Sequence, residues 1–340
     1  MDPITHGLLG ATFAKVITGK RLPRGAALIG ALAAMAPDVD VFMPSFGDPT
    51  AEWVYHRSLT HGLIVIPLGG LLCALPFLLS ARFKPYRWAV IWAAMIGYAS
   101  HTMLDSLTNY GTQQLRPFAD TRVTWDAMPI VDPLYSLILI VGLCLMSRWA
   151  KAVRWSLALS LLYVAFGFWQ HQRAEQVQQT LLTMRHQQAT QARVLPMPGW
   201  LIFWRSLYIA DGKVHADGIQ LPWFSQPQVL SGHSAEVITL NALPAAAQAN
   251  AETVRRFKVL EWFSGGYLAA VDGLPNTIGD QRLTGAIETL NPLWGLQLDE
   301  TGATRGWTNP QPGFETLVNG LFFGDARFHP LHRIVVAPLR

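Results

Sequence analysis

Residues 62–81 have the sequence GLIVIPLGGLLCALPFLLSA and contain no charged side chain. An uncharged apolar stretch of about 20 residues is long enough for a helix to cross the hydrocarbon core of a bilayer. Residues 86–104, 134–146 and 153–169 are similar or somewhat shorter. In the whole chain 51% of residues are hydrophobic and only 14% are charged, whereas about a quarter are charged in ordinary soluble domains. The sequence therefore predicts an integral membrane protein.

Two further segments near the N-terminus, residues 4–18 and 26–42, are apolar but short, and they are rich in Gly and Ala. Small residues favour close packing between helices over contact with lipid. With the four segments above, they predict an α-helical membrane protein with about six membrane-associated helices.

The C-terminal part has a different composition. Residues 171–191 are polar and Gln-rich, with apolar residues at helical spacing, and after Pro196 and Pro198 the chain has short aromatic and β-branched runs at 200–209, 254–263 and 333–336. Such runs, broken by Gly, Pro, Asn and Asp, are typical of strands. We therefore expect a membrane-embedded helical domain over 1–170, a connecting polar helix over 171–195, and a small mainly-β or α+β extramembrane domain over 196–340.

The orientation follows from the basic residues, which cluster in three short connectors. These are Lys20, Arg21 and Arg24, then Arg82, Lys84 and Arg87, then Arg148, Lys151 and Arg154. By the positive-inside rule these connectors face the cytoplasm, which places the N-terminus and everything after Trp169 on the opposite side. The net charge of +4 then reflects topology, and no nucleic-acid partner is expected.

Seven side chains that can bind metal occur in the first 105 residues. Each lies near one end of an apolar segment, and this end is the one farther from the basic connectors. They are His6, Asp38, Asp40, His56, His61, His101 and Asp105. Ionisable groups close to hydrocarbon are costly to keep, so a set of them on one side indicates a function. Cys73 and Cys144 fall inside apolar segments, which leaves nitrogen and oxygen ligands for the metal.

His101 and Asp105 form the strongest pair, because residues four apart share one face of a helix and can reach one cation. The spacing of His56 and His61 separates their side chains on a helix, so at least part of that segment should be a turn. Taken singly, an Asp at a helix end is more often a cap and a lone His an interfacial residue. The seven residues together favour a metal site.

The motifs MDPITHGLLG, APDVD, HRSLTHGL, HTMLDSLTNYGT and WDAMPIVDPLY, at residues 1–10, 36–40, 56–63, 101–112 and 125–135, resemble the LexA-binding, inner-membrane-associated metal-dependent hydrolases. The resemblance covers about half the chain and extends more weakly into PGWLIFWRSLYIADGKVHADG at 198–218. It implies a metal-dependent hydrolase of the bacterial inner membrane. Together with the orientation above, we expect a multi-pass protein with the metal site and C-terminal domain outside the cytoplasm. Because the metal ligands face away from the cytoplasm, a LexA partner is not carried over.

That family is distantly similar to zinc-dependent phospholipase C and P1 nuclease, in which a His-x-x-x-Asp pair, an earlier Asp and an intervening His hold zinc. The similarity implies that His101 and Asp105 form the pair, that Asp38 or Asp40 is the earlier carboxylate, and that His56 or His61 is the imidazole between them. His6 resembles the early His of that group. No counterpart of the group's later ligands follows Asp105, so we expect one or two divalent ions, with zinc as the leading candidate.

The expected function is metal-dependent hydrolysis of phosphoesters or lipid head groups at the outer face of the inner membrane. The cation would activate a water, Asp40 or Asp38 would accept its proton, and Arg57 or Thr60 would stabilise the developing negative charge. Membrane lipid and a small-molecule or lipid phosphoester are the expected partners. Two alternatives remain: a non-catalytic metal-stabilised scaffold, and a cation- or proton-coupled transporter, which the lack of polar residues in mid-span disfavours.

Overall fold

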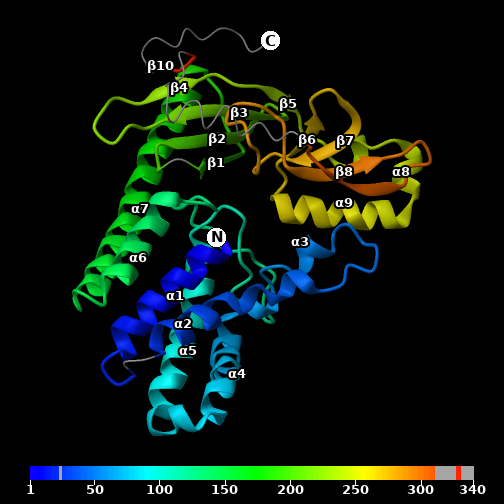
Figure 1. Ribbon diagram of the computed structural model, residues 1–340. Coiled ribbons are helices and arrows are strands. Elements are labelled where there is room, and N and C mark those ends of the chain that lie inside the picture. Colours follow the sequence, from blue (N-terminus) through cyan, green and yellow to red (C-terminus); the bar gives the residue numbers. More distant parts are fainter. Residues whose placement is uncertain (23–24, 199, 311–326, 331–340) are drawn as a thin grey trace. The chain divides into compact units, whose positions relative to one another are not determined.

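The computed structural model describes residues 1–22, 25–198, 200–310 and 327–330 (Figure 1). The chain forms two compact units. The first consists of residues 1–44 and 55–168, and the second of residues 45–54 and 169–340. The second boundary falls inside a helix, close to residue 170, where the sequence changes composition. The grouping of residues 45–54 with the C-terminal unit has no counterpart in the sequence pattern.

The first unit is helical, and two of its helices begin at caps that are visible in the sequence. The carboxylate of Asp2 accepts a hydrogen bond from the backbone N–H of Thr5 at 3.0 Å, and Asp132 accepts bonds from the N–H groups of Leu134 and Tyr135 at 3.0 Å. These side chains satisfy backbone donors that a helix leaves free at its start. The helices are α1 (Pro3–Thr18), α2 (Ala26–Met35), η1 (Pro37–Phe42), η2 (Leu59–His61), η3 (Leu63–Val65), α4 (Ile66–Leu79), η4 (Ala81–Tyr86), α5 (Arg87–Ser106), α6 (Pro133–Leu145) and α7 (Ala152–Met184), which continues into the second unit.

Helices α1, α2 and α5 pack against one another at three glycines. A Cβ atom at Gly10 would lie 2.4 Å from the carbonyl oxygen of Gly30, and one at Gly97 would lie 2.3 Å from the same oxygen. Approaches below 3.0 Å are essentially never made by Cβ atoms, so these backbones touch because side chains are missing. The prediction of close packing by the Gly- and Ala-rich segments is confirmed. The contact holds together the three segments that carry His6, Asp38 and His101.

The prediction of about six membrane-associated helices is wrong. Within the described residues, α7 alone is long and apolar enough to cross a membrane, and a second span requires counting Ala51–His61 and Leu63–Leu79, which are bent by 49° at a break, as one. Helix α5 has 20 residues but is not apolar enough to count as a span, and the other apolar segments form helices that are too short. Helices α2 and α6 have 10 and 13 residues, or about 15 and 20 Å, against a hydrocarbon core of about 30 Å.

The second unit contains two antiparallel β-sheets, as expected for a mainly-β C-terminal domain. The first has the order β1-β2-β3-β4-β10, with β5 also paired to β3, and the second has the order β6-β7-β8-β9. Leu195, Leu207 and Val214 of the first sheet share a buried core with Tyr267 and Ala269. The strands are β1 (Gln191–Pro196), β2 (Phe203–Ala210), β3 (Lys213–Gln220), β4 (Gln228–Leu230), β5 (Ser234–Glu236), β6 (Leu268–Val271), β7 (Leu274–Asp280), β8 (Trp294–Leu298), β9 (Thr304–Thr308) and β10 (His329–Pro330).

Residues 254–263, expected as a strand, lie instead in helix α9 (Ala251–Ser264), so this prediction is wrong. The side chain of Asn250 caps the helix by accepting bonds from the N–H groups of Glu252 and Thr253, and Gly265 ends it in the left-handed conformation. These end signals, with Phe257, Leu260 and Phe263 buried at helical spacing, outweigh the β-propensity of single residues. The remaining short helices are α3 (Ala51–Tyr55), η5 (Leu240–Ala242) and α8 (Ala245–Ala249). The expected strand at 333–336 lies outside the described residues.

We expect Gly30→Val to lower the free energy of unfolding by about 1–3 kcal/mol, because an added side chain must push α1 and α5 away from α2. The readout is the thermal unfolding midpoint of detergent-solubilised protein. Leu28→Val places the same residue on the exposed face of α2 and controls for helix propensity. Equal midpoints for the two variants would show that the glycine contact does not stabilise the unit.

Candidate metal centre

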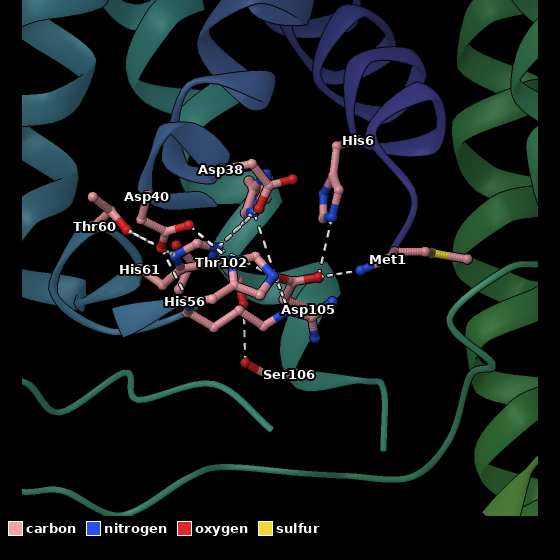
Figure 2. Close-up of polar contacts among 12 residues, drawn as sticks. Met1, His6, Asp38, Asp40, His56, Thr60, His61, Thr102, Asp105 and Ser106 are labelled. Atoms are coloured by element: carbon pink, nitrogen blue, oxygen red, sulfur yellow. Dashed lines mark hydrogen bonds and ion pairs between the residues drawn. The ribbon is translucent and has the colours of Figure 1, made fainter. Parts of the chain in front are cut away.

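Four side chains that can bind metal converge within the first unit, as Figure 2 shows for three of them by label. Asp38 lies in η1, His61 lies at the end of η2, and His101 and Asp105 lie one turn apart in α5. One ligand atom from each lies within 4.8 Å of every other. The side chains of His61, His101 and Asp105 are fully buried, whereas 18% of the Asp38 side chain is exposed.

Four distances between ligand atoms are close to those of a tetrahedral site, and the two Nε2 atoms lie closer together. The Nε2 atom of His61 lies 2.8 Å from Nε2 of His101, 3.5 Å from Oδ1 of Asp38 and 3.3 Å from Oδ2 of Asp105. The Nε2 atom of His101 lies 3.3 Å from the same Asp38 oxygen and 3.4 Å from the same Asp105 oxygen. Metal bonds of about 2.0–2.1 Å place the corners of a tetrahedron about 3.3–3.4 Å apart. These four atoms therefore fit around one small cation.

The hydrogen-bond partners of the two imidazoles assign their tautomers. Nδ1 of His101 lies 2.6 Å from the carbonyl oxygen of Ala34, which can only accept, so Nδ1 carries the hydrogen. Nδ1 of His61 lies 3.0 Å from Thr60 Oγ1 and 3.2 Å from Asp40 Oδ2, and a carboxylate again requires the hydrogen on Nδ1. In the neutral rings both Nε2 atoms then present lone pairs to each other at 2.8 Å. Such an arrangement repels unless a metal ion or a proton lies between them.

The charge state of the carboxylates suits a cation. Burial alone would raise the pKa of Asp38, but the imidazoles of His101 and His61 outweigh it and hold the pKa well below its usual range. Burial would also raise the pKa of Asp105, but nearby positive groups outweigh it and keep this pKa low. The Arg57 guanidinium has the strongest effect among them. Both groups therefore remain ionised at neutral pH, as metal ligands must be.

Asp40 and His56 form a second group with Asp38, with ligand atoms also within 4.8 Å of one another. Nδ1 of His56 lies 2.8 Å from Oδ1 of Asp40. The other oxygen of Asp40 accepts hydrogen bonds from the Arg57 N–H at 3.0 Å and from the Thr60 hydroxyl at 2.7 Å. Asp40 thus orients His56 and His61, and Asp38 is the residue that the two groups share. This sharing allows one ion or two.

Arg57 and Thr60, expected to stabilise developing negative charge, contact carboxylates of the two groups. Nε of Arg57 lies 3.0 Å from Oδ2 of Asp105, and a second guanidinium nitrogen donates to Thr108 Oγ1 at 2.8 Å. The guanidinium also lies 4.7 Å from the ring centroid of Tyr110. The Thr60 hydroxyl donates to Asp40. In this geometry both side chains position carboxylates, and no contact assigns them to a substrate.

His6 lies beside the centre but outside the two groups. Its ring stacks on that of His101 with centroids 3.6 Å apart, and its Nε2 lies 3.1 Å from Oδ1 of Asp105. The amino group of Met1 contacts the same oxygen (Figure 2). Burial, together with nearby His101, keeps the pKa of His6 well below its usual value. His6 is therefore a neutral imidazole that packs on one ligand and hydrogen-bonds another.

Sequence reasoning missed several residues that hold the centre in place. The backbone carbonyl of Ala34 has no sequence signal, because any residue supplies the same oxygen. Thr108 follows Asp105 by three residues and Tyr98 precedes His101 by three, so both positions on or next to α5 could have been found from helical spacing. The Tyr98 hydroxyl donates to the carbonyl oxygen of Thr60 at 2.7 Å, which ties α5 to η2.

The N-terminal half of the chain is similar to known inner membrane proteins. The sequence profile of the YdjM inner membrane protein family matches residues 1–174. Inner membrane protein YbcI of Escherichia coli (strain K12) is 30% identical over 132 residues, which cover 37% of this chain and 75% of that protein. No solved structure matches the chain. These matches do not support the resemblance to LexA-binding proteins or to phospholipase C and P1 nuclease. They show that the chain belongs to the YdjM family of inner membrane proteins.

Proposed function

We propose that this inner membrane protein is a metal-dependent hydrolase that acts on phosphoesters or lipid head groups. The observation that carries the proposal is the pair of imidazole Nε2 atoms held 2.8 Å apart beside two carboxylate oxygens. His61, His101, Asp105 and Asp38 would hold a divalent cation, and nitrogen and oxygen ligands of this kind suit zinc. When bound, such an ion lowers the pKa of a coordinated water and polarises a phosphoryl or acyl oxygen.

The chain's own residues divide into ligands and supports. Asp38 is the most exposed ligand and belongs to both groups, so it is the better candidate to accept a proton from a water at the centre. Asp40 is the weaker candidate for this role because both of its oxygens already bond to neighbours. Arg57 offsets the negative charge of Asp105 and keeps that carboxylate in place.

One observation favours a second function, a non-catalytic scaffold stabilised by metal. Three of the four ligand side chains are fully buried, and four protein ligands around one ion are typical of closed structural sites. A hydrolase needs one coordination position open to water. The partial exposure of Asp38 is the feature on which the choice between these functions depends.

We also propose that the centre lies toward the outer face of the membrane. The basic residues Lys20, Arg82 and Arg87 lie at or beyond one end of α1, α4 and α5, and the metal ligands lie at or beyond the opposite ends of these helices. Helix α7 likewise begins among Lys151 and Arg154. By the positive-inside rule the basic ends face the cytoplasm, and the C-terminal unit beyond α7 is extracytoplasmic.

We expect protein purified without chelator to contain at least one equivalent of zinc or another divalent ion per chain. His101→Ala should lose this metal, because it removes one Nε2 ligand, and Asp105→Asn should lose it by removing the ionised oxygen. Elemental analysis after gel filtration measures the ratio. His233→Ala, which changes an exposed histidine in the second unit, is the matched control. Metal content that stays the same in His101→Ala and Asp105→Asn would exclude both residues from the site.

Hydrolysis separates the enzyme from the scaffold. We expect the metal-loaded protein to hydrolyse bis(4-nitrophenyl) phosphate or phospholipid in nanodiscs, and we expect chelation or His101→Ala to reduce the rate at least 100-fold. Re-addition of zinc should restore hydrolysis by the chelated wild-type protein but not by His101→Ala. Full metal occupancy without turnover of either substrate, combined with a lower unfolding midpoint after chelation, would support the scaffold instead.

The orientation is tested with reporters fused after Arg340. We expect alkaline phosphatase at this position to be active and green fluorescent protein to be dark in a bacterial host, because the first folds outside the cytoplasm and the second inside. A fusion after Lys84, at the basic end of the first unit, should give the opposite pair of results. A fluorescent fusion after Arg340 would contradict the proposed orientation.

A further inference from the structure

The segment that supplies Asp38 alternates buried carboxylates with exposed apolar side chains. In η1, Asp40 is buried and Asp38 is mostly buried, while Val39, Val41 and Phe42 are 59%, 52% and 82% exposed. The short repeat of a 3₁₀-helix turns neighbouring side chains in different directions. The same turn that presents two carboxylates to the centre therefore presents three hydrocarbon side chains outward.

Two neighbouring segments continue this apolar surface. Leu59 and Ile64, which flank His61, are each 54% exposed, and Phe118 is 78% exposed. Element η2 contacts η1, and the N–H of Leu63 donates to the carbonyl oxygen of Gln114 at 2.9 Å, which places the loop that contains Phe118 next to η3. We call this surface the apolar rim. It consists of Val39, Val41, Phe42, Leu59, Ile64 and Phe118.

The apolar rim is continuous in sequence with a lipid-like helix face. Helix α4 follows η3 directly and exposes Leu68, Leu71, Leu72, Leu75 and Leu79 at helical spacing, with exposed fractions of 45–76%. An exposed leucine stripe of this size marks contact with a membrane or another protein. Leu63–Leu79 is also the apolar arm of the bent pair that counts as a span only together with Ala51–His61, and the 17 residues of this arm measure about 25 Å. The rim therefore lies at the end of this arm, where the pair bends.

The metal centre is accessible on the side where Asp38 and His56 lie. Their side chains are 18% and 15% exposed, whereas those of His61 and His101 are fully buried. Asp38 belongs to η1, and Asp40, which bonds to His56, also bonds to Thr60 beside Leu59. The partly exposed ligands thus lie in or next to the segments that carry the rim residues of η1 and η2.

We propose that the apolar rim lies in the lipid–water interface of the inner membrane and admits the phosphate-bearing head group of a membrane phospholipid to the metal centre. The family is an inner membrane family, and the rim extends the face of α4 that would contact lipid, so a bilayer is the occupant that the surface fits. The substrate is then a lipid that stays in the membrane, and not a soluble phosphoester. The substrate assignment rests on the proposed hydrolase function, while the position of the rim does not.

The test measures the depth of single fluorophores in nanodiscs of phosphatidylethanolamine and phosphatidylglycerol. Phe42→Cys and Phe118→Cys are introduced into a Cys73→Ser, Cys144→Ser background and labelled. Leu162→Cys, on the exposed face of α7, is the membrane control, and Glu300→Cys, an exposed acidic position in the second unit, is the aqueous control. Each probe is quenched with lipids that carry a nitroxide at carbon 5 or carbon 16, and with iodide in the buffer.

We expect both rim probes to be quenched at least twofold more by the carbon 5 nitroxide than by the carbon 16 nitroxide, and to be shielded from iodide relative to Glu300→Cys. Rim probes that respond to iodide as strongly as Glu300→Cys, and not to either nitroxide, would overturn the proposal. Shielding from iodide without nitroxide quenching, with a dimeric mass, would assign the rim to a second copy of the chain and also overturn it.

The same probes are measured in the His101→Ala background. Rim quenching that persists there would show that the membrane position does not depend on the metal, and an absence of metal in protein that retains His101 would then remove the hydrolase alone. Metal and turnover that remain while the rim is aqueous would retain the hydrolase and remove the lipid substrate. The two proposals therefore fail separately.

Discussion

The structure depends on two imidazole nitrogens that are held 2.8 Å apart beside two carboxylates. When both rings are neutral, neither can turn its hydrogen toward the other, because Nδ1 of His101 bonds to the carbonyl oxygen of Ala34 and Nδ1 of His61 to Asp40 and Thr60. Two ionised carboxylates beside them add negative charge. The arrangement is unfavourable without a positive charge at its centre, and a divalent cation supplies that charge with four ligands at suitable distances.

The packing of the first unit supplies the constraint that keeps these atoms together. Gly10, Gly30 and Gly97 bring the backbones of α1, α2 and α5 into contact, and each helix places a ligand or a supporting group at the same end. Asp40 then links the turn after α2 to the segment around His56 and His61. Long-range contacts of this kind fix a site more firmly than neighbours on one helix can, because all the segments must move for any ligand to move.

The sequence indicated much of the centre and less of the membrane architecture. The spacing of His101 and Asp105, and the position of each candidate ligand at the end of an apolar segment away from the basic connectors, were visible without a structure. The division between ligands and supports was not, because Asp38 and Asp40 differ only in which way a 3₁₀ turn directs them. The roles of Arg57 and Thr60 likewise depend on contacts between distant segments.

Hydropathy overestimated the number of spans because it does not register where helices end. Apolar composition continues through the region of Pro37 and Gly62, but α2 stops at Met35 and α4 begins only at Ile66. In the second unit, the aromatic and β-branched residues of 254–263 suggested a strand, and the cap at Asn250 and the glycine at 265 decided for a helix. Local end signals thus carried information that composition did not.

The central claim is that two histidine nitrogens and two carboxylate oxygens bind one cation. X-ray absorption at the metal edge of protein purified without chelator tests it most directly. The account predicts a first shell of about four nitrogen and oxygen atoms at about 2.0–2.1 Å, with outer-shell scattering from two imidazoles. A shell that contains sulfur or lacks imidazole scattering, or the absence of any metal in folded protein, would contradict it.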